Sequence, residues 1–258
     1  MTSFSRQMQE NIAYAAELLR KAKHAVVLTG AGISTPSGIP DFRSAGTGLW
    51  SRDEPMEVAS LSTFRVDPER FFVWFRPLAG QIFKAKPNPA HAALAKLENA
   101  DYVKGIITQN IDYLHHKAGS KNVIEMHGTM RTLSCTQCFK QESAEKYLKA
   151  FIEQGDLPRC PTCKSLMKPD VILFGEQLPQ QAWRDAQREC RQCDLIVVAG
   201  SSIEVLPVAG LPMQAIDRGA HLIILNNTET YLDVRADLVI QEDVAVIVPA
   251  IAEQVFNG

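Results

Sequence analysis

Four of the six cysteines have the spacing of a zinc site. They form two C-x-x-C pairs, Cys135 with Cys138 and Cys160 with Cys163, with 21 residues between the pairs. This spacing is typical of a zinc ribbon, in which four thiolates complete the coordination of one Zn²⁺. Because such a site leaves no position for an activated water, we expect one structural zinc and not a hydrolytic one. Reduced cysteines in a core are the alternative.

The remaining cysteines, Cys190 and Cys193, form a third C-x-x-C pair far along the chain. They lie at the end of an expected helix and just before an expected strand. We interpret them as ordinary thiols, and a redox-sensitive pair is the alternative.

A glycine turn follows the first apolar run of the sequence. Gly30, Ala31 and Gly32 stand where a dinucleotide phosphate turn is expected, directly after a strand. The two glycines let the backbone approach a pyrophosphate, Ser34 adds a hydroxyl donor, and a helix start after them favours negative charge. Thr35 occupies the third glycine position of the dehydrogenase fingerprint. The sequence therefore predicts nucleotide binding without hydride transfer, although a simple tight turn is the alternative.

Other polar residues follow apolar runs or lie in a long loop. Gln109-Asn110-Ile111-Asp112 comes after residues 105–108, at the end of a strand where open α/β sheets bind ligands. Asn and Asp are also common helix caps. His127 follows residues 123–126, and a lone histidine is more often structural. Asp41-Phe42-Arg43 combines an acid, an aromatic ring and a cation in the Gly-, Ser- and Pro-rich stretch 34–55, as a surface turn also would.

The order of these motifs closely resembles the sirtuin family of NAD-dependent protein deacylases. GAGISTPSGIPDFRS (Gly30–Ser44) is followed by TQNID, EMHG and the two C-x-x-C pairs, and then by FGE (Phe174–Glu176), GSS (Gly200–Ser202) and ILNN (residues 224–227). Each motif is modest alone, but the ordered set is very specific. It covers the chain from about Gly30 to Val244.

The resemblance implies roles for the matching residues. His127 is expected to be the general base, and Asn110 is expected to be catalytic by orienting the nicotinamide carboxamide. The implied NAD contacts are Gly30, Ala31, Gly32, Ser34, Asp41, Phe42, Arg43, Gln109, Asn110, Ile111, Asp112, Gly200, Ser201, Ser202, Asn226, Asn227 and Val244. The implied contacts to an acyl-lysine protein or peptide, held by β-augmentation, are Ile172, Phe174, Gly175 and Glu176.

The resemblance also implies a reaction in which NAD is a consumed co-substrate. The substrate amide oxygen attacks C1′ of the nicotinamide ribose, and nicotinamide leaves. His127 then activates a ribose hydroxyl, as an imidazole with a pKa near neutrality would. The expected products are free lysine, nicotinamide and O-acyl-ADP-ribose. Mono-ADP-ribosyl transfer to protein is the alternative reaction, and a non-catalytic NAD or ADP-ribose sensor with a zinc module is the alternative outside enzymes.

The acyl group is predicted from the aromatic stretch at residues 71–76. Sirtuins that prefer dicarboxylic acyl groups carry a Tyr and an Arg three residues apart, and Phe72 and Phe75 are expected at those positions here. Arg76 is one residue out of register, and a helix turns about 100° per residue. An apolar pocket favours acetyl or longer neutral chains over succinyl. A plain hydrophobic core is the alternative interpretation of these rings.

The elements that position these residues alternate between strands and helices. Apolar runs at 25–29, 105–108, 123–126, 171–174, 195–199 and 222–226 predict buried strands, and helical patterns are expected at 8–19, 89–99, 180–189 and 205–218. The sequence therefore predicts an α/β fold: a Rossmann-like parallel sheet with helices on both faces and a small inserted zinc-ribbon and helical module. We expect the NAD-binding domain at 1–32, 81–128 and 170–258, the cofactor loop and helices at 33–80, and the zinc module at 129–169.

Composition limits the classes of partner. The apolar fraction is 46%, the charged fraction 22% and the formal net charge −2, as in an ordinary globular protein without a global basic field. The segment between the cysteine pairs is not strongly basic and has no clear aromatic platform, so we expect no direct nucleic acid binding. No apolar run approaches a membrane span, and the polar start of the chain lacks a signal-like apolar region. We expect a cytoplasmic protein with no membrane partner.

Overall fold

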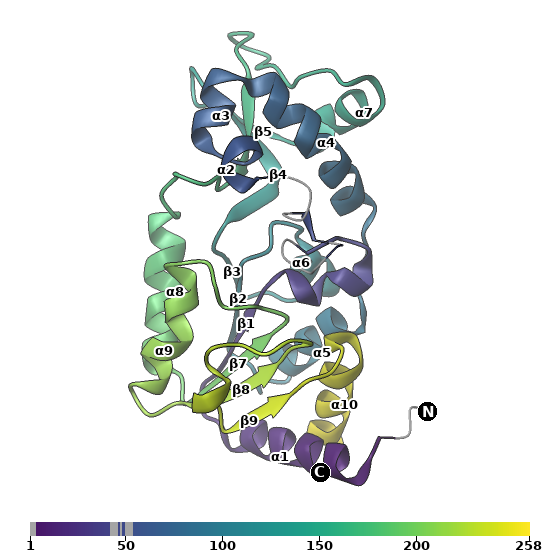
Figure 1. Cartoon of the computed structure of the whole chain (residues 1–258), viewed down its shortest axis with the longest axis vertical. Coiled ribbons are helices and arrows are strands. Elements are labelled where there is room, and N and C mark those ends of the chain that lie inside the picture. Colours follow the sequence, from purple (N-terminus) through teal and green to yellow (C-terminus); the bar gives the residue numbers. More distant parts are fainter. Residues whose placement is uncertain (1–3, 42–45, 47, 50–53) are drawn as a thin grey trace.

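The structure is a computed structural model that describes residues 4–41, 46, 48, 49 and 54–258. Phe42 and Arg43, two of the expected NAD contacts, lie outside the described residues. The molecule is elongated, with a parallel sheet in its lower part and a smaller module above it (Figure 1).

Six parallel strands form the central sheet, in the order β3-β2-β1-β7-β8-β9. Continuous runs of apolar and β-branched residues predict strands that are buried on both faces, and every residue of β1 and β7 is buried. The predicted parallel sheet is confirmed, and β9 was not predicted. The strands are β1 (Ala25–Thr29), β2 (Gly105–Thr108), β3 (Val123–Glu125), β7 (Leu195–Ala199), β8 (His221–Leu225) and β9 (Leu238–Ile240).

Helices cover both faces of this sheet (Figure 1). One face, which includes Val27, packs in one core with α1 (Arg6–Lys21), α5 (Pro89–Asn99) and α10 (Val244–Asn257). The other face, which includes Val26, packs in a second core with α8 (Gln180–Gln192) and α9 (Leu211–Ile216). Because successive side chains of a strand point to opposite faces, two adjacent valines of β1 contribute to two different cores.

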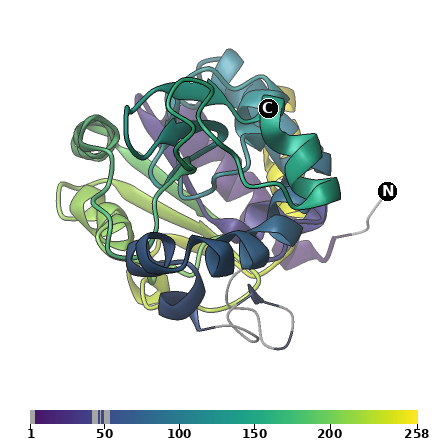
Figure 2. The same ribbon diagram turned by 90° about the horizontal axis from the view of Figure 1, so that it is seen from above.

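The smaller module combines helices with an antiparallel sheet, as Figure 2 shows from above. Its helices are α2 (Pro55–Val58), α3 (Leu61–Val66), α4 (Pro68–Lys84) and α7 (Glu145–Gln154), and its strands are β4 (Gly128–Cys135), β5 (Gln141–Ser143) and β6 (Met167–Val171), in the order β5-β4-β6. Phe71 and Phe72 of α4 share one core with Phe151 of α7. The predicted inserted module is therefore present, and residues 55–84 pack with the segment that carries the cysteines.

Two expected elements differ from the structure. The strand expected at 171–174 is wrong, because β6 ends at Val171 and the chain turns there: the N–H of Leu173 donates to Glu176 Oε2 at 2.8 Å. The helix expected at 205–218 is shorter and begins at Leu211 after a 3₁₀ turn at Val208–Gly210. Pro212 lies in its first turn, where a missing N–H costs no hydrogen bond.

The remaining described elements are α6 (Leu114–Ala118) and 3₁₀ turns at Ala31–Ile33, Thr35–Ser37 and Asp233–Arg235. No helix among the described residues is long and apolar enough to cross a membrane.

Candidate active site

A cavity of about 970 Å³ lies where the carboxyl ends of β1, β2 and β7 meet the smaller module. This is the edge at which open α/β sheets bind ligands. The structure brings most of the predicted site residues together in its wall: Gly30, Ala31, Gly32, Ser34, Asp41, Gln109, Asn110, Ile111, Asp112, His127, Ile172, Phe174, Gly175, Glu176, Gly200, Ser201, Ser202 and Asn226. Asn227, which is exposed, and Val244, which is buried at the start of α10, do not line it. Their NAD contacts stay predictions.

Residues 30–38, which we call the glycine loop, approach the end of β7 closely. The N–H of Gly32 donates to the carbonyl oxygen of Gly200 at 2.8 Å. A Cβ on Gly32 would lie 2.9 Å from both the Cα and the carbonyl oxygen of Gly200. Gly200 itself has φ +65°, in the left-handed region that favours glycine. The absence of a side chain at Gly32 and Gly200 thus allows the two backbones to touch, in addition to leaving room for a ligand.

No α-helix follows the glycines, contrary to expectation. The loop forms two three-residue 3₁₀ turns, Ala31–Ile33 and Thr35–Ser37. Pro36 sits inside the second turn and lacks the N–H that a longer helix needs, and Gly38 ends it at φ +85°. The charge stabilisation expected from a helix N-terminus is therefore weakened here, because the N–H groups of Gly32, Ile33 and Ser34 already donate to backbone carbonyl oxygens.

The turn at residues 109–112 is fixed to the glycine loop through side chains. Asn110 Nδ2 donates to the carbonyl oxygen of Gly30 at 2.9 Å and to Ser34 Oγ at 3.1 Å. Ser34 Oγ in turn donates to Asp112 Oδ2 at 2.6 Å. The second oxygen of Asp112 accepts the N–H of Leu114 at 2.8 Å. Asp112 therefore binds the first N–H of α6, one residue before the N-cap Tyr113, and borders the cavity at once, whereas Asn110 is not a cap.

Burial controls the charge of this turn. It raises the pKa of Asp112 above the ordinary range, and the hydrogen bonds from Ser34 and Leu114 oppose that rise. Glu125, at the end of β3, is also partly buried, and this raises its pKa to about 7. Of these two carboxyl groups only Asp112 lines the cavity, and burial inclines it toward neutrality.

His127 is held in one tautomer. Its Nδ1 lies 3.0 Å from the carbonyl oxygen of Gln109, and because a carbonyl only accepts, the ring proton sits on Nδ1. The free lone pair is then on Nε2. Burial lowers the pKa of His127, and the Gln109 carbonyl opposes this change. At neutral pH the ring is therefore an uncharged imidazole with an available base nitrogen.

An apolar wall from α4 closes one end of the cavity. Trp74, Leu78 and Ile82 line it at intervals of four residues, which places them on one face of the helix. Phe75 lines it beside them. Sequence reasoning missed Trp74, Leu78 and Ile82, although their i, i+4, i+8 spacing was the available signal.

The register predicted for the acyl pocket is wrong by one helical turn. Phe72 does not line the cavity, because its ring packs in the core against Phe71 at 5.2 Å and Phe151 at 5.5 Å. The pair three residues apart that faces the cavity is Phe75 and Leu78. Arg76 does point elsewhere, as expected: its guanidinium lies over the Phe151 ring, 5.8 Å from the centroid.

The FGE segment is anchored by a half-buried ion pair. Glu176 Oε2 lies 2.9 Å from Lys168 Nζ on β6 and accepts the N–H of Leu173. Lys168 also donates to the carbonyl oxygen of Val171 at 2.7 Å. Phe174 is held from the other side by backbone hydrogen bonds with Ala59 and Leu61. The carboxylate of Glu176 is therefore occupied within the protein, and Lys168 is a supporting residue that sequence reasoning did not find.

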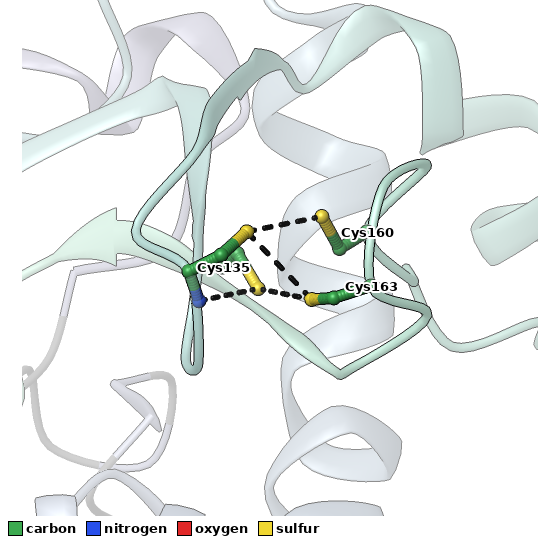
Figure 3. Close-up of side chains that lie close together, drawn as sticks. Cys135, Cys160 and Cys163 are labelled. Carbon is green, nitrogen blue, oxygen red and sulfur yellow. Dashed lines mark hydrogen bonds between the residues drawn. The ribbon is translucent and has the colours of Figure 1, made fainter.

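The four predicted zinc ligands form one cluster, with all four sulfur atoms within 4.8 Å of one another. The Sγ atoms of Cys135 and Cys163 are 3.3 Å apart, and those of Cys138 and Cys160 are 3.6 Å apart. Figure 3 shows Cys135 facing Cys160 and Cys163 across the space between two loops. A tetrahedral ZnS₄ site with bonds of about 2.3 Å places its sulfurs about 3.8 Å apart. The cluster fits a structural zinc ion, as predicted.

The third cysteine pair is separate from this cluster. Cys190 and Cys193 are both buried, and burial raises the pKa of both thiols. A protonated, buried thiol is a poor nucleophile and a poor metal ligand. Cys190 and Cys193 are therefore not zinc ligands in this arrangement, and their interpretation as ordinary thiols stays a prediction.

Comparisons with known proteins agree with this geometry. The model of the Sir2 family matches residues 30–207. NAD-dependent protein deacylase 2 of Archaeoglobus fulgidus is 45% identical over 249 residues, which are 96% of this chain and 97% of that protein. NAD-dependent protein deacylase of Pseudomonas putida is 37% identical over 246 residues, 94% of each chain.

Solved structures give the same result. A Sir2 enzyme structure that concerns mechanism and regulation has a TM-score of 0.90 and 44% identity, covering 96% of this chain and 99% of its own. Sir2Tm bound to a propionylated peptide has a TM-score of 0.84 and 40% identity, with coverages of 96% and 98%. Sir2Af2 bound to a myristoylated histone peptide has a TM-score of 0.83 and 40% identity, again with 96% and 98%. With its sheet, glycine loop, half-buried His127 and cysteine cluster all in place, the chain belongs to the Sir2 family.

Proposed function

We infer that this protein is an NAD-dependent protein-lysine deacylase that transfers the acyl group of a modified lysine to ADP-ribose. The observation that carries this conclusion is the fixed tautomer of His127, whose free Nε2 belongs to a side chain lining the large cavity. Relatives that match nearly the whole chain are named NAD-dependent protein deacylases or deacetylases. The same cavity is therefore proposed to hold NAD and the acyl-lysine together.

Each side of the cavity has a proposed task. The glycine loop and residues 200–202, joined by the contact between Gly32 and Gly200, would hold the phosphates and the adenosine half of NAD. The 109–112 turn would orient the nicotinamide carboxamide through Asn110 and Asp112. His127 Nε2 would accept the proton of a ribose hydroxyl, a step that positioned bases accelerate by about 10²- to 10⁴-fold. NAD supplies the ribose carbon that receives the acyl oxygen and is consumed.

The acyl group is proposed to be neutral and apolar. Trp74, Leu78 and Ile82 form an uncharged row that spans eight residues of α4, about 12 Å at 1.5 Å per residue. Arg76, the nearest cation on this helix, lies over Phe151 and does not line the cavity. A carboxylate buried against this wall would meet no cation on this face of α4 and would lose its hydration there. We therefore propose acetyl and longer neutral acyl chains over succinyl.

The peptide is proposed to add a strand between residues 174–176 and 202–205, two segments that border the same cavity. The ion pair of Glu176 with Lys168 supports this proposal, because it holds the first segment in an extended turn at the cavity edge. A cytoplasmic location is also proposed. It is supported by the six cysteines, all of which are described and free of disulfide bonds.

The proposed function is tested by mixing the protein with NAD and an acetyl-, myristoyl- or succinyl-lysine peptide and following the products by mass spectrometry. We expect equal amounts of nicotinamide and O-acyl-ADP-ribose from the first two peptides. His127→Ala should lower the rate by about 10²- to 10⁴-fold. The matched control is His221→Ala, which removes an exposed histidine paired with Asp237 far from the cavity and should leave the rate unchanged.

Two outcomes would contradict the proposal. Release of free carboxylic acid without NAD would exclude acyl transfer to ADP-ribose. ADP-ribose left covalently on protein, without O-acyl-ADP-ribose, would favour mono-ADP-ribosyl transfer, the alternative that the same cavity could support.

A further inference from the structure

A row of buried polar side chains adjoins the 109–112 turn without lining the cavity. Thr29, at the end of β1, donates through Oγ1 to Thr108 Oγ1 at the end of β2, at 2.9 Å. Thr108 Oγ1 also accepts the backbone N–H of Asn110 at 3.1 Å. Thr29 Oγ1 lies 2.9 Å from His115 Nε2 on α6. None of these four residues is more than 9% exposed. Water does not reach their polar atoms, so these hydrogen bonds within the protein satisfy them.

The proton positions in this row follow from the donors available. A hydroxyl has one proton, and Thr29 gives its proton to Thr108. Thr29 must therefore accept from His115, which places the ring proton of His115 on Nε2. Burial lowers the pKa of His115 well below its ordinary range, so the ring is neutral. Its Nδ1 is then a bare acceptor.

A second histidine, His91, also carries its ring proton on Nε2, but in this ring Nε2 is the nitrogen without a partner. His91 Nδ1 accepts the N–H of Asn88 at 3.4 Å, so its ring proton sits on Nε2. Burial lowers the pKa of His91 to about 4, and this ring is neutral too. The side chain of Asn88 donates to the carbonyl oxygen of Ile33 at 2.7 Å and to Ser37 Oγ at 3.0 Å, both in the glycine loop.

The two free nitrogens complement each other. His91 Nε2 and His115 Nδ1 are buried and have no hydrogen-bond partner among the described residues. The first is a donor and the second an acceptor, and the ring centroids are only 4.8 Å apart. A hydrogen bond between these two nitrogens is the pairing that would satisfy both. Because a buried polar atom without a partner is costly, this pairing would remove two penalties at once.

We propose that Asn88, His91, His115, Thr29 and Thr108 form one directional hydrogen-bond chain that positions the backbone of Asn110. Each member donates to the next, from the N–H of Asn88 through His91, His115 and Thr29 to Thr108. Thr108 Oγ1 also accepts the N–H of Asn110, which arrives from the other side. Asn88 and Asn110 each bind the glycine loop directly, so the chain ties both ends of that loop to the 109–112 turn. This inference rests on the proposed role of Asn110 in holding nicotinamide. Thr29 and His115 are positioning residues, because neither lines the cavity.

The kinetic test replaces Thr29 by valine, which keeps the shape and removes the hydroxyl, and by serine, which restores it. Thr29→Val should raise the KM for NAD and the inhibition constant for nicotinamide by about tenfold, because small displacements of positioning groups have effects of this order. The KM for the acyl peptide should stay unchanged. Thr29→Ser should recover most of the loss. The matched control is Thr230→Val, which removes a hydroxyl bonded to Asp233 at a residue that does not line the cavity and should change neither constant.

The structural test is independent of activity and needs no variant. ¹⁵N chemical shifts of the unmodified protein should show His115 as the Nε2–H tautomer with Nδ1 as a hydrogen-bond acceptor, and His91 as the Nε2–H tautomer. A His115 ring protonated at Nδ1 would overturn the proposed direction. Wild-type NAD kinetics in Thr29→Val, with Asn110→Ala impaired, would overturn the positioning role alone. Wild-type kinetics in Asn110→Ala would instead overturn the proposed role of Asn110.

Discussion

Replacing Gly32 by alanine tests the contact between the glycine loop and β7. The new Cβ would lie 2.9 Å from two backbone atoms of Gly200, and ordinary contact begins at 3.4 Å. The loop must therefore move away from β7 by at least about 0.5 Å, because backbone atoms of a buried strand end cannot turn aside as a side chain can. The same movement strains the hydrogen bond from Gly32 to Gly200.

The size of the effect follows from this displacement. Overpacking of this kind costs about 1–3 kcal/mol of folding free energy. A misplacement of about 1 Å at positioning groups costs about a hundredfold in catalysis. A shift of half that size should therefore raise the KM for NAD roughly tenfold, while the KM for the acyl peptide stays near the wild-type value.

The assay is a steady-state titration of NAD at saturating peptide, with urea unfolding to measure stability. Gly210→Ala is the matched control: Gly210 has φ −81°, and a Cβ there meets nothing within 4 Å. Gly210→Ala should leave the KM for NAD unchanged, and the free energy of unfolding should stay the same or rise slightly. If Gly32→Ala binds NAD as tightly as Gly210→Ala does, the loop tolerates displacement and the close-contact argument is refuted.

Two further predictions concern the metal and the buried histidines. Cys160→Ser should lose the single zinc per chain and several kcal/mol of unfolding free energy, measured by elemental analysis and urea unfolding. Cys190→Ser should keep the metal. Metal loss in Cys190→Ser would overturn the ligand assignment. His91 has a folded pKa of about 4 against about 6.5 when unfolded, so the unfolded state binds its proton first and stability falls as pH drops from about 6.5 to 4. Over that range wild type should lose about 3 kcal/mol more than His91→Gln, and equal losses would show that His91 is not buried in the neutral form.

The sequence predicts the central sheet well because its strands are buried on both faces. The bounds expected for β1, β2 and β7 are those of the structure. In such strands the hydrophobic run and the strand coincide, since no residue faces water. The order of the motifs then locates the site, because parallel strands bring their carboxyl ends to one edge of the sheet.

The same rule fails at residues 171–174, where an equally apolar run is not a strand. There the side chain of Glu176 takes the N–H of Leu173, and β6 ends at Val171. A local hydrogen bond from a side chain competes with a strand ladder, and hydrophobicity does not report it. Lys168, which neutralises that carboxylate, is found only once β6 and the FGE segment are seen together.

The register of the acyl pocket needed the structure for a different reason. Every residue from Phe71 to Phe75 is apolar, so the pattern does not say which face of α4 meets the cavity and which meets α7. The rotation of α4 about its axis is set by Phe151. The Phe72 ring and the Arg76 guanidinium both pack against the Phe151 ring, on the face of α4 away from the cavity. Packing against an element some 80 residues away decides the register, and one sequence without its partners carries no such information.

The corrected register gives a specific exchange of acyl preference. Phe75 and Leu78 have the three-residue spacing of the Tyr and Arg that dicarboxylate-preferring sirtuins carry, and both line the cavity. Phe75→Tyr combined with Leu78→Arg should place a hydroxyl and a guanidinium against the acyl end. A succinyl carboxylate then gains a charge-assisted bidentate partner, and kcat/KM for succinyl-lysine should rise by one to two orders of magnitude, about 1.5–3 kcal/mol. The myristoyl peptide should lose activity, because its chain would have to bury the new charge.

The control removes the cation that α4 already carries two residues before Leu78. Arg76 already lies on α4 but over Phe151, so Arg76→Met should leave the ratio of succinyl to acetyl activity unchanged while removing the contact to that ring. Acyl panels measured side by side for the wild type, the double variant and Arg76→Met separate the two positions. If the double variant folds, keeps its KM for NAD and still rejects succinyl-lysine, Leu78 does not face the acyl end and the register argued from the structure is wrong. If Arg76→Met shifts the ratio, the guanidinium reaches the pocket despite its distance, and selectivity then depends on movement of α4 and not on the side chains that line the cavity.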